Sequence, residues 1–159
     1  ILQAFADWTA ETFGFVTPGQ EEAEAPQDDP YNTLRLAVSK ETDIPTVPSW
    51  FPDGTVLIGN ISVVEHLDKT RIQASFETNK GQFTIRVQIY NTVPEKYEGT
   101  YQVDNEFSEP YEVDGIIHYI MSNNDTNSVA WVNGVVEGHI QGNLSVEDLK
   151  EMVNSIYQG

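Results

Sequence analysis

Two alternating stretches in the middle of the chain give its clearest structural signal. Ile72, Ala74 and Phe76 alternate with polar residues, and the same period of two returns over residues 83–89. Such alternation places one face of a strand in a core and the other in water. The Asn-Lys-Gly turn at residues 79–81 joins the two runs, so we expect an antiparallel hairpin.

Shorter runs of the same kind predict further strands. They cover residues 56–65, 100–103, 111–113, 116–121, 128–132 and 135–141. The segments between several of them are turn formers, namely Asp114 with Gly115, the polar stretch 123–127, and Asn133 with Gly134. Short turns between consecutive strands predict a curved antiparallel meander sheet.

The apolar period becomes helical at the C-terminal end, over residues 145–157. Ser145 can cap this helix, and Asp148 three residues later completes a variant capping box. Leu144 and Leu149 are spaced as a hydrophobic staple. One face carries the apolar side chains of Val146, Leu149, Met152, Val153 and Ile156. A stripe that wide must pack on another element, and the preceding sheet offers the surface.

The N-terminal part has a different character. Residues 1–16 carry apolar side chains at loosely helical spacing, which predicts an amphipathic arm or helix. Residues 17–30 are rich in Pro, Gly and acidic residues and are expected to form an acidic linker. A short helix is predicted near residues 31–41, and an extended connector follows it.

That connector contains Pro45, Pro48 and Pro52 around Trp50 and Phe51, so we expect it to hold the two aromatic rings against the core. The chain is therefore predicted to be α+β. A single domain over residues 31–159 would consist of the meander sheet packed by the C-terminal helix, with the short helix near its start.

Composition narrows the function classes. A chain of 159 residues with 39% hydrophobic content fits one domain. Eight Lys and Arg against 25 Asp and Glu give a formal charge of -17, which would repel nucleic acid and anionic lipid. The absence of Cys removes disulfides, thiolate nucleophiles and Cys-based zinc sites. The sequence has neither a basic-then-apolar signal peptide nor an apolar run long enough to span a membrane.

Candidate catalytic residues do not form a recognisable frame. His66, His118 and His139 lack metal-ligand spacing, although His118 and His139 could share a sheet face, and we expect ordinary surface or half-buried histidines. The acidic residues between Glu95 and Asp114 could pair as in glycoside hydrolases, but their abundance makes chance pairing more frequent. The sequence predicts no metal site, no cofactor and no enzymatic activity.

Aromatic residues offer an alternative to catalysis. Side chains in the connector and the strands could line a groove for a peptide, glycan or lipid, although strand aromatics more often pack in a core. The proposed groove residues are Trp50, Tyr90, Tyr119 and Trp131.

Several segments together resemble a known family. They comprise residues 5–15, the connector at 47–54, the turn at 113–115, Trp131 with Asn133 and Gly134, and the helix start at 142–149. The likeness is to the domain of unknown function 4367, an extracytoplasmic C-terminal domain of single-span membrane proteins in Firmicutes, some of which resemble anti-sigma factors. These motifs are strand, turn and cap residues, so the resemblance implies a fold rather than an activity.

The resemblance also implies a setting. The chain begins Ile-Leu-Gln without Met, and we expect a transmembrane helix and a cytoplasmic part upstream of Ile1, with this domain on the extracytoplasmic face of the membrane. The expected function is a non-enzymatic sensing or interaction domain, anti-sigma-like in regulation, whose partner is a protein or a cell-envelope ligand. The alternatives are a lipid or lipoprotein carrier and, less favoured, a wall-glycan hydrolase.

Overall fold

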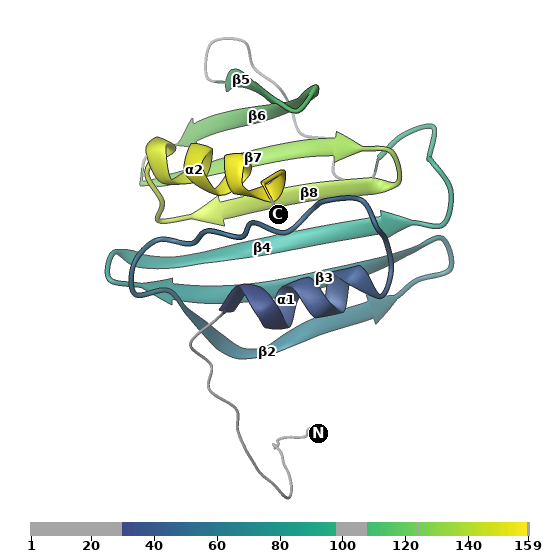
Figure 1. Cartoon of the computed structure of the whole chain (residues 1–159), viewed down its shortest axis with the longest axis horizontal. Coiled ribbons are helices and arrows are strands. Elements are labelled where there is room, and N and C mark those ends of the chain that lie inside the picture. Colours follow the sequence, from purple (N-terminus) through teal and green to yellow (C-terminus); the bar gives the residue numbers. More distant parts are fainter. Residues whose placement is uncertain (1–29, 98–107, 124, 159) are drawn as a thin grey trace, which may run out of the picture.

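An antiparallel sheet of seven strands forms the body of the molecule, and two helices lie on one of its faces (Figure 1). The computed structural model describes residues 30–97, 108–123 and 125–158. The elements in chain order are α1 (Pro30–Ser39), β2 (Val56–Glu65), β3 (Lys69–Thr78), β4 (Gly81–Tyr90), β5 (Ser108–Val113), β6 (Ile116–Asn123), β7 (Thr126–Asn133), β8 (Val136–Gly142) and α2 (Val146–Ile156). The predicted α+β class, with a C-terminal helix on an antiparallel sheet, is confirmed.

The strand order is β2-β3-β4-β8-β7-β6-β5, so the sheet consists of two meanders rather than one. The chain crosses from β4 to the far edge at β5 and then returns strand by strand until β8 pairs with β4. Both edges of the sheet therefore come from the first strand of a meander. The expected strand at 100–103, the arm at 1–16 and the linker, except for Pro30, lie outside the described residues.

Three of the tight hairpins show how turns set the register of the strands. In the β3–β4 hairpin, Thr78 pairs with Gly81 across Asn79 and Lys80. Between β5 and β6 the backbone angles φ of Asp114 and Gly115 are 56° and 81°, as a type I′ turn requires. The third turn lies one residue later than the Asn-Gly pattern predicts, because Asn133 still belongs to β7 and pairs with Val136.

The core lies between the sheet and the helices. Phe76 and Phe83 stack with ring centroids 5.1 Å apart, and Phe51 of the connector lies 5.2 Å from Phe76. Leu149 and Met152 of α2 have no exposed surface. The predicted apolar stripe of this helix is thus buried on the sheet, and the Asp148 amide donates to the Ser145 hydroxyl at 3.0 Å, which confirms the cap.

The connector crosses the helix-bearing face between α1 and α2 (Figure 1). Ser155, a buried polar residue in the last turn of α2, fixes it there. Its hydroxyl accepts hydrogen bonds from the backbone N–H groups of Ser49 and Trp50, at 3.0 and 3.1 Å. Because unpaired backbone groups are costly in a buried setting, these bonds determine where Trp50 sits.

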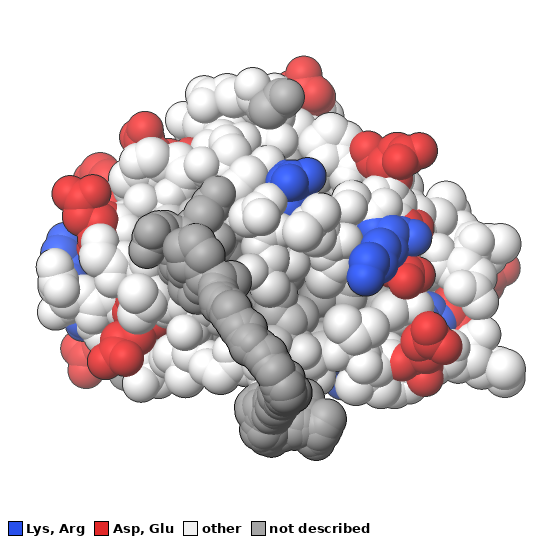
Figure 2. Space-filling model, turned by 60° about the horizontal axis from the view of Figure 1, so that its bottom comes forward, with Lys and Arg blue, Asp and Glu red and all other residues white. Residues whose placement is uncertain are grey.

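The surface is predominantly acidic. Figure 2 shows carboxylate side chains spread over the periphery of the molecule, with a few basic side chains among them. In the described part of the chain, no helix has the length and apolar character needed to cross a membrane.

Candidate functional site

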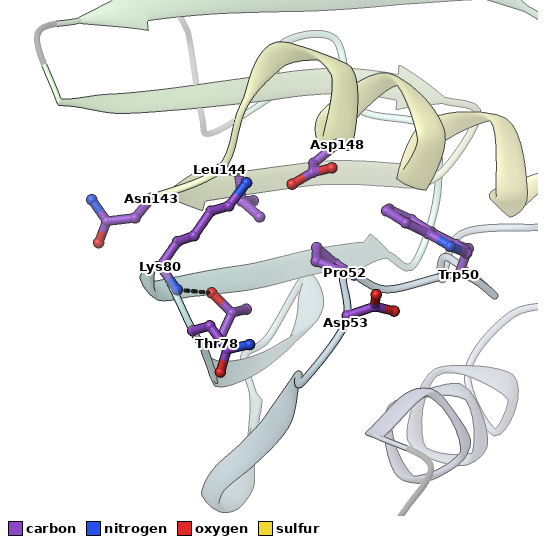
Figure 3. A pocket seen from close by; sticks show the side chains of 9 residues that line it. Trp50, Pro52, Asp53, Thr78, Lys80, Asn143, Leu144 and Asp148 are labelled. Atoms are coloured by element: carbon purple, nitrogen blue, oxygen red, sulfur yellow. Dashed lines mark hydrogen bonds between the residues drawn. The ribbon is translucent and has the colours of Figure 1, made fainter.

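A hollow of about 280 Å³ lies where the N-terminal end of α2 meets the connector and the β3–β4 hairpin (Figure 3). We call it the Trp50 hollow. Each of the three segments contributes three lining residues: Trp50, Pro52 and Asp53 from the connector, Thr78, Asn79 and Lys80 from the hairpin, and Asn143, Leu144 and Asp148 from the start of α2.

Apolar groups form part of the Trp50 hollow. The partly buried Trp50 indole stands at one side, with Pro52 beside it (Figure 3). Leu144, which is buried, belongs to the staple that opens α2. The Trp50 amide donates to the Ser155 hydroxyl, so the indole is carried by a connector that is anchored to a helix.

Hydrogen bonds also position the hairpin side of the hollow. The Asn143 amide donates to the Gln82 carbonyl at 2.9 Å, and its side-chain oxygen accepts from the Gln82 amide at 3.2 Å. Within the hairpin, the Thr78 hydroxyl accepts from the Lys80 amide at 3.0 Å (Figure 3). The hollow therefore has walls tied to the sheet on one side and to α2 on the other.

Three charged side chains surround the Trp50 hollow without neutralising one another. The carboxylates of Asp53 and Asp148 and the ammonium group of Lys80 all come from its lining. Among the described residues, none of these three groups forms an ion pair or a side-chain hydrogen bond. Asp148 lies in the first turn of α2, where the helix dipole favours a negative charge. The hollow thus presents free hydrogen-bonding groups of both signs.

The four aromatic residues proposed from the sequence do not share one groove. Trp50 lines the hollow described above, but Trp131 is 2% exposed and lies in the core, where its ring covers Gly138. Tyr90 is buried on the opposite, helix-free face of the sheet, and its hydroxyl donates to Glu137 at 2.9 Å. Tyr119 pairs with Ala130 on that same helix-free face, several strands away. Strand alternation separates these rings, because successive residues point to opposite faces.

His118 differs from the expectation of a surface or half-buried residue, because it is fully buried under α2. One ring nitrogen, Nε2, lies 2.8 Å from the Tyr157 hydroxyl, and Nδ1 lies 3.2 Å from the Tyr111 carbonyl. Burial lowers the pKa of His118 and raises the pKa of Tyr157 to about 12. With both ring nitrogens of its neutral imidazole placed against hydrogen-bonding partners, His118 contributes to the packing under α2.

His139 lies on the helix-free face, not on the face of His118 as the sequence had suggested. Its cross-strand partner Ala130 pairs with Tyr119, which points opposite to its neighbour His118. Burial, and secondly the positive charge of Arg86, lower the pKa of His139 to about 4. Arg86 and His139 line a second hollow of about 450 Å³, whose other lining residues are mostly glutamine and threonine.

A buried carboxylate lies next to that second hollow in the sheet. Glu137 is 2% exposed, and its Oε1 accepts hydrogen bonds from the Gln88 side chain and the Tyr90 hydroxyl. Its other oxygen is buried and has no hydrogen-bond partner among the described residues. Gln88 in turn accepts from the Arg71 guanidinium at 3.2 Å. This network links side chains of β3, β4 and β8 across the helix-free face of the sheet.

In its described part, the acidic region considered for hydrolysis distributes its carboxylates over different places on the sheet. Glu109 binds Lys150 at 2.8 Å, and Glu112 lies on the other face of β5, three positions along the strand. Asp114 sits in the type I′ turn. Glu98, Asp104 and Glu106 lie outside the described residues. No group of three or more potential metal ligands occurs in the described segments.

Among the residues that line the hollow, the sequence identified Trp50 as a candidate binding residue and gave most of the others a structural role. Asn79 and Lys80 were interpreted as turn formers, Asp148 as part of a cap, and Asp53 only as part of the connector. Turn and cap residues are positioned next to Trp50 only by the tertiary fold. One signal was available: Asp53 follows the Trp-Phe-Pro sequence directly, so a charge was certain to lie near an aromatic ring.

These features define an α+β domain with an open antiparallel sheet and a ligand-sized hollow at the N-terminal end of its last helix. The chain belongs to the family described as domain of unknown function (DUF4367), whose model matches residues 45–156. The matched range begins in the connector and ends in α2, and so includes every residue that lines the Trp50 hollow. No curated protein and no solved structure matches the chain.

Proposed function

We propose that this domain is a non-enzymatic sensing or interaction domain that recognises a cell-envelope ligand at the Trp50 hollow. One observation supports it most: an indole and three uncommitted charged groups from separate segments converge on a single hollow. Binding pockets combine apolar surface with a few polar groups in this way. Ser155 anchors the backbone that carries the indole, and such anchoring favours a site formed before a ligand arrives.

We further propose the setting in which such recognition is useful. The family resemblance supports a domain on the extracytoplasmic face of a bacterial membrane, carried by a single-span protein of the kind found in Firmicutes. In that arrangement the domain would report ligand binding to an anti-sigma-like regulatory part on the other side. The acidic surface suits this role, because it stays soluble beside an anionic membrane without adhering to it.

The packed interior disfavours the alternative function, a lipid or lipoprotein carrier. Leu149, Met152 and Val153 of α2 have no exposed surface, and they fill the space over the sheet together with Trp131. A lipid chain would have to displace these side chains. The hydrolase alternative would need a carboxylate pair, and Glu109 is already bound to Lys150.

A thermal-shift screen with fractionated cell-envelope extract tests the proposal, using the wild-type chain and Trp50→Ala in parallel. A ligand that binds only the folded state raises the melting temperature in proportion to its saturation. We expect at least one fraction to stabilise the wild type and to leave Trp50→Ala unchanged. Equal stabilisation of both proteins, or of neither by any fraction, would overturn the assignment of the site.

A further inference from the structure

We infer that the Trp50 hollow binds a neutral, hydroxyl-rich sugar ring, the unit of a glycan. The inference rests on the proposed function of this hollow and adds the chemical class of its ligand. It is argued from the shape of the apolar part, the donors and acceptors around it, and the charge.

The apolar part suits a ring with one apolar face. The Trp50 indole stands beside Pro52, with the buried Leu144 also in the lining (Figure 3). A pyranose presents a face of C–H groups and an edge of hydroxyl groups. An indole covers the first and leaves the second free to bond, since aromatic side chains combine a large apolar surface with directional contacts.

The polar groups around the indole are mixed in kind. Carboxylates such as Asp53 and Asp148 only accept hydrogen bonds, whereas the Lys80 ammonium group only donates them. The Asn79 side chain can do both. A hydroxyl group also donates and accepts, so a sugar can satisfy all of these partners at once.

Charged ligands fit these polar groups less well. An anion would gain from Lys80 but would meet two carboxylates, Asp53 and Asp148. An amine would gain from the carboxylates but would compete with the ammonium group already present. The formal charge of -17 for the whole chain adds to the repulsion of phosphate- or carboxylate-bearing glycans. A neutral ligand avoids both conflicts.

The size of the hollow indicates how much of the ligand it holds. Its volume of about 280 Å³ lies near the lower limit of roughly 300 Å³ for sites that enclose drug-sized molecules. One ring can therefore occupy it, with neighbouring rings of a glycan chain outside. Weak binding of a single unit is expected, strengthened when several domains contact one polymer.

The test is a titration of the full chain, labelled with ¹⁵N, with chitotetraose, cellotetraose and mannotetraose, followed by NMR. We expect at least one of them to shift the Trp50 indole signal and the backbone signals of Lys80 and Asp148. Trp50→Ala should weaken that binding by at least about tenfold. The matched control is Tyr119→Ala, which removes a partly exposed ring from the helix-free face and should leave binding unchanged.

Two further titrations distinguish a wrong ligand class from a wrong binding site. Cadaverine tests an amine and inorganic phosphate tests an anion. If none of the sugars shifts the Trp50 signals while cadaverine, phosphate or an envelope fraction does, the sugar assignment is overturned and the proposed site stands. If envelope fractions also leave these signals unchanged, both fail. Unfolding curves for each variant establish that a loss of binding is not a loss of the fold.

Discussion

Ser155 near the end of α2 and Ser49 in the connector, 106 positions apart, hold each other by reciprocal hydrogen bonds. The Ser155 hydroxyl accepts from the Ser49 amide at 3.0 Å, and the Ser49 hydroxyl donates to the Ser155 carbonyl at 2.8 Å. The Ser155 hydroxyl also accepts from the Trp50 amide. The last helix of the chain thereby fixes the backbone position from which the indole enters the proposed site.

Ser155→Ala should lower the free energy of unfolding by about 1–3 kcal/mol, because the amides of Ser49 and Trp50 lose their acceptor. Chemical denaturation measures this change. The matched control is Ser39→Ala, which removes an exposed hydroxyl that donates to the Leu36 carbonyl within α1. Equal stability of wild type and Ser155→Ala would show that these hydrogen bonds do not anchor the connector.

Leu149→Ala and Met152→Ala should each destabilise the protein by ~2 to 5 kcal/mol, the range for removing a fully buried side chain. Both residues have no exposed surface in the packed α2 stripe. Thermal and chemical unfolding of each variant give the comparison. Glu151→Ala, on the exposed side of the same helix, serves as control. If Leu149→Ala and Met152→Ala both unfold like this control, the packing of α2 on the sheet is refuted.

Ser145→Ala should cost about 1 kcal/mol, since the Asp148 amide loses the hydroxyl that caps α2. Ser145→Asp restores an acceptor at the same position and should recover most of this loss. A Ser145→Ala protein as stable as wild type, or one that Ser145→Asp fails to improve upon, would contradict the capping role.

Stability should fall as the pH is lowered from 6.5 toward about 4, in part through His139. Burial, followed by Arg86, lowers its pKa from the ordinary 6.5 to about 4. In that interval the unfolded chain binds a proton that the folded chain does not, so acidification favours unfolding. The stabilising contribution is complete above pH 6.5 and is lost through this window. Buried His118, whose pKa is also lowered, acts in the same direction.

Unfolding measured at several pH values for His139→Gln tests this expectation. The variant has no titrating group at the position, so its stability should depend less on pH between 6.5 and 4 than that of the wild type. His66→Gln changes an exposed histidine and is the control. Parallel curves for wild type and His139→Gln would show that His139 does not contribute.

Much of the fold could be predicted from local patterns. Alternation identified β3 and β4, the Asp114 and Gly115 turn has positive φ at both residues as a type I′ hairpin needs, and Ser145 caps α2. Each of these features depends on residues close in sequence. The pairing of β8 with β4 was not predictable in this way, because it joins strands separated by the crossover to β5.

The site was harder to predict for the same reason. Trp50 was identified from its chemistry, but Asp53, Lys80 and Asp148 join it only when the connector, a hairpin and α2 come together. Trp131 was proposed for the groove because aromatic side chains can line a ligand site, although strand aromatics more often pack in a core. Its neighbour in the pairing is Gly138, whose missing side chain makes room for the indole in the core.

The most direct test of binding at the Trp50 hollow uses the three tryptophan indole N–H signals in an NMR spectrum, for Trp8, Trp50 and Trp131. Trp50→Phe assigns the relevant signal. On addition of the envelope fraction that stabilises the protein, the Trp50 signal should move progressively to saturation while that of the buried Trp131 stays in place. A stationary Trp50 signal under saturating ligand would contradict binding at this hollow.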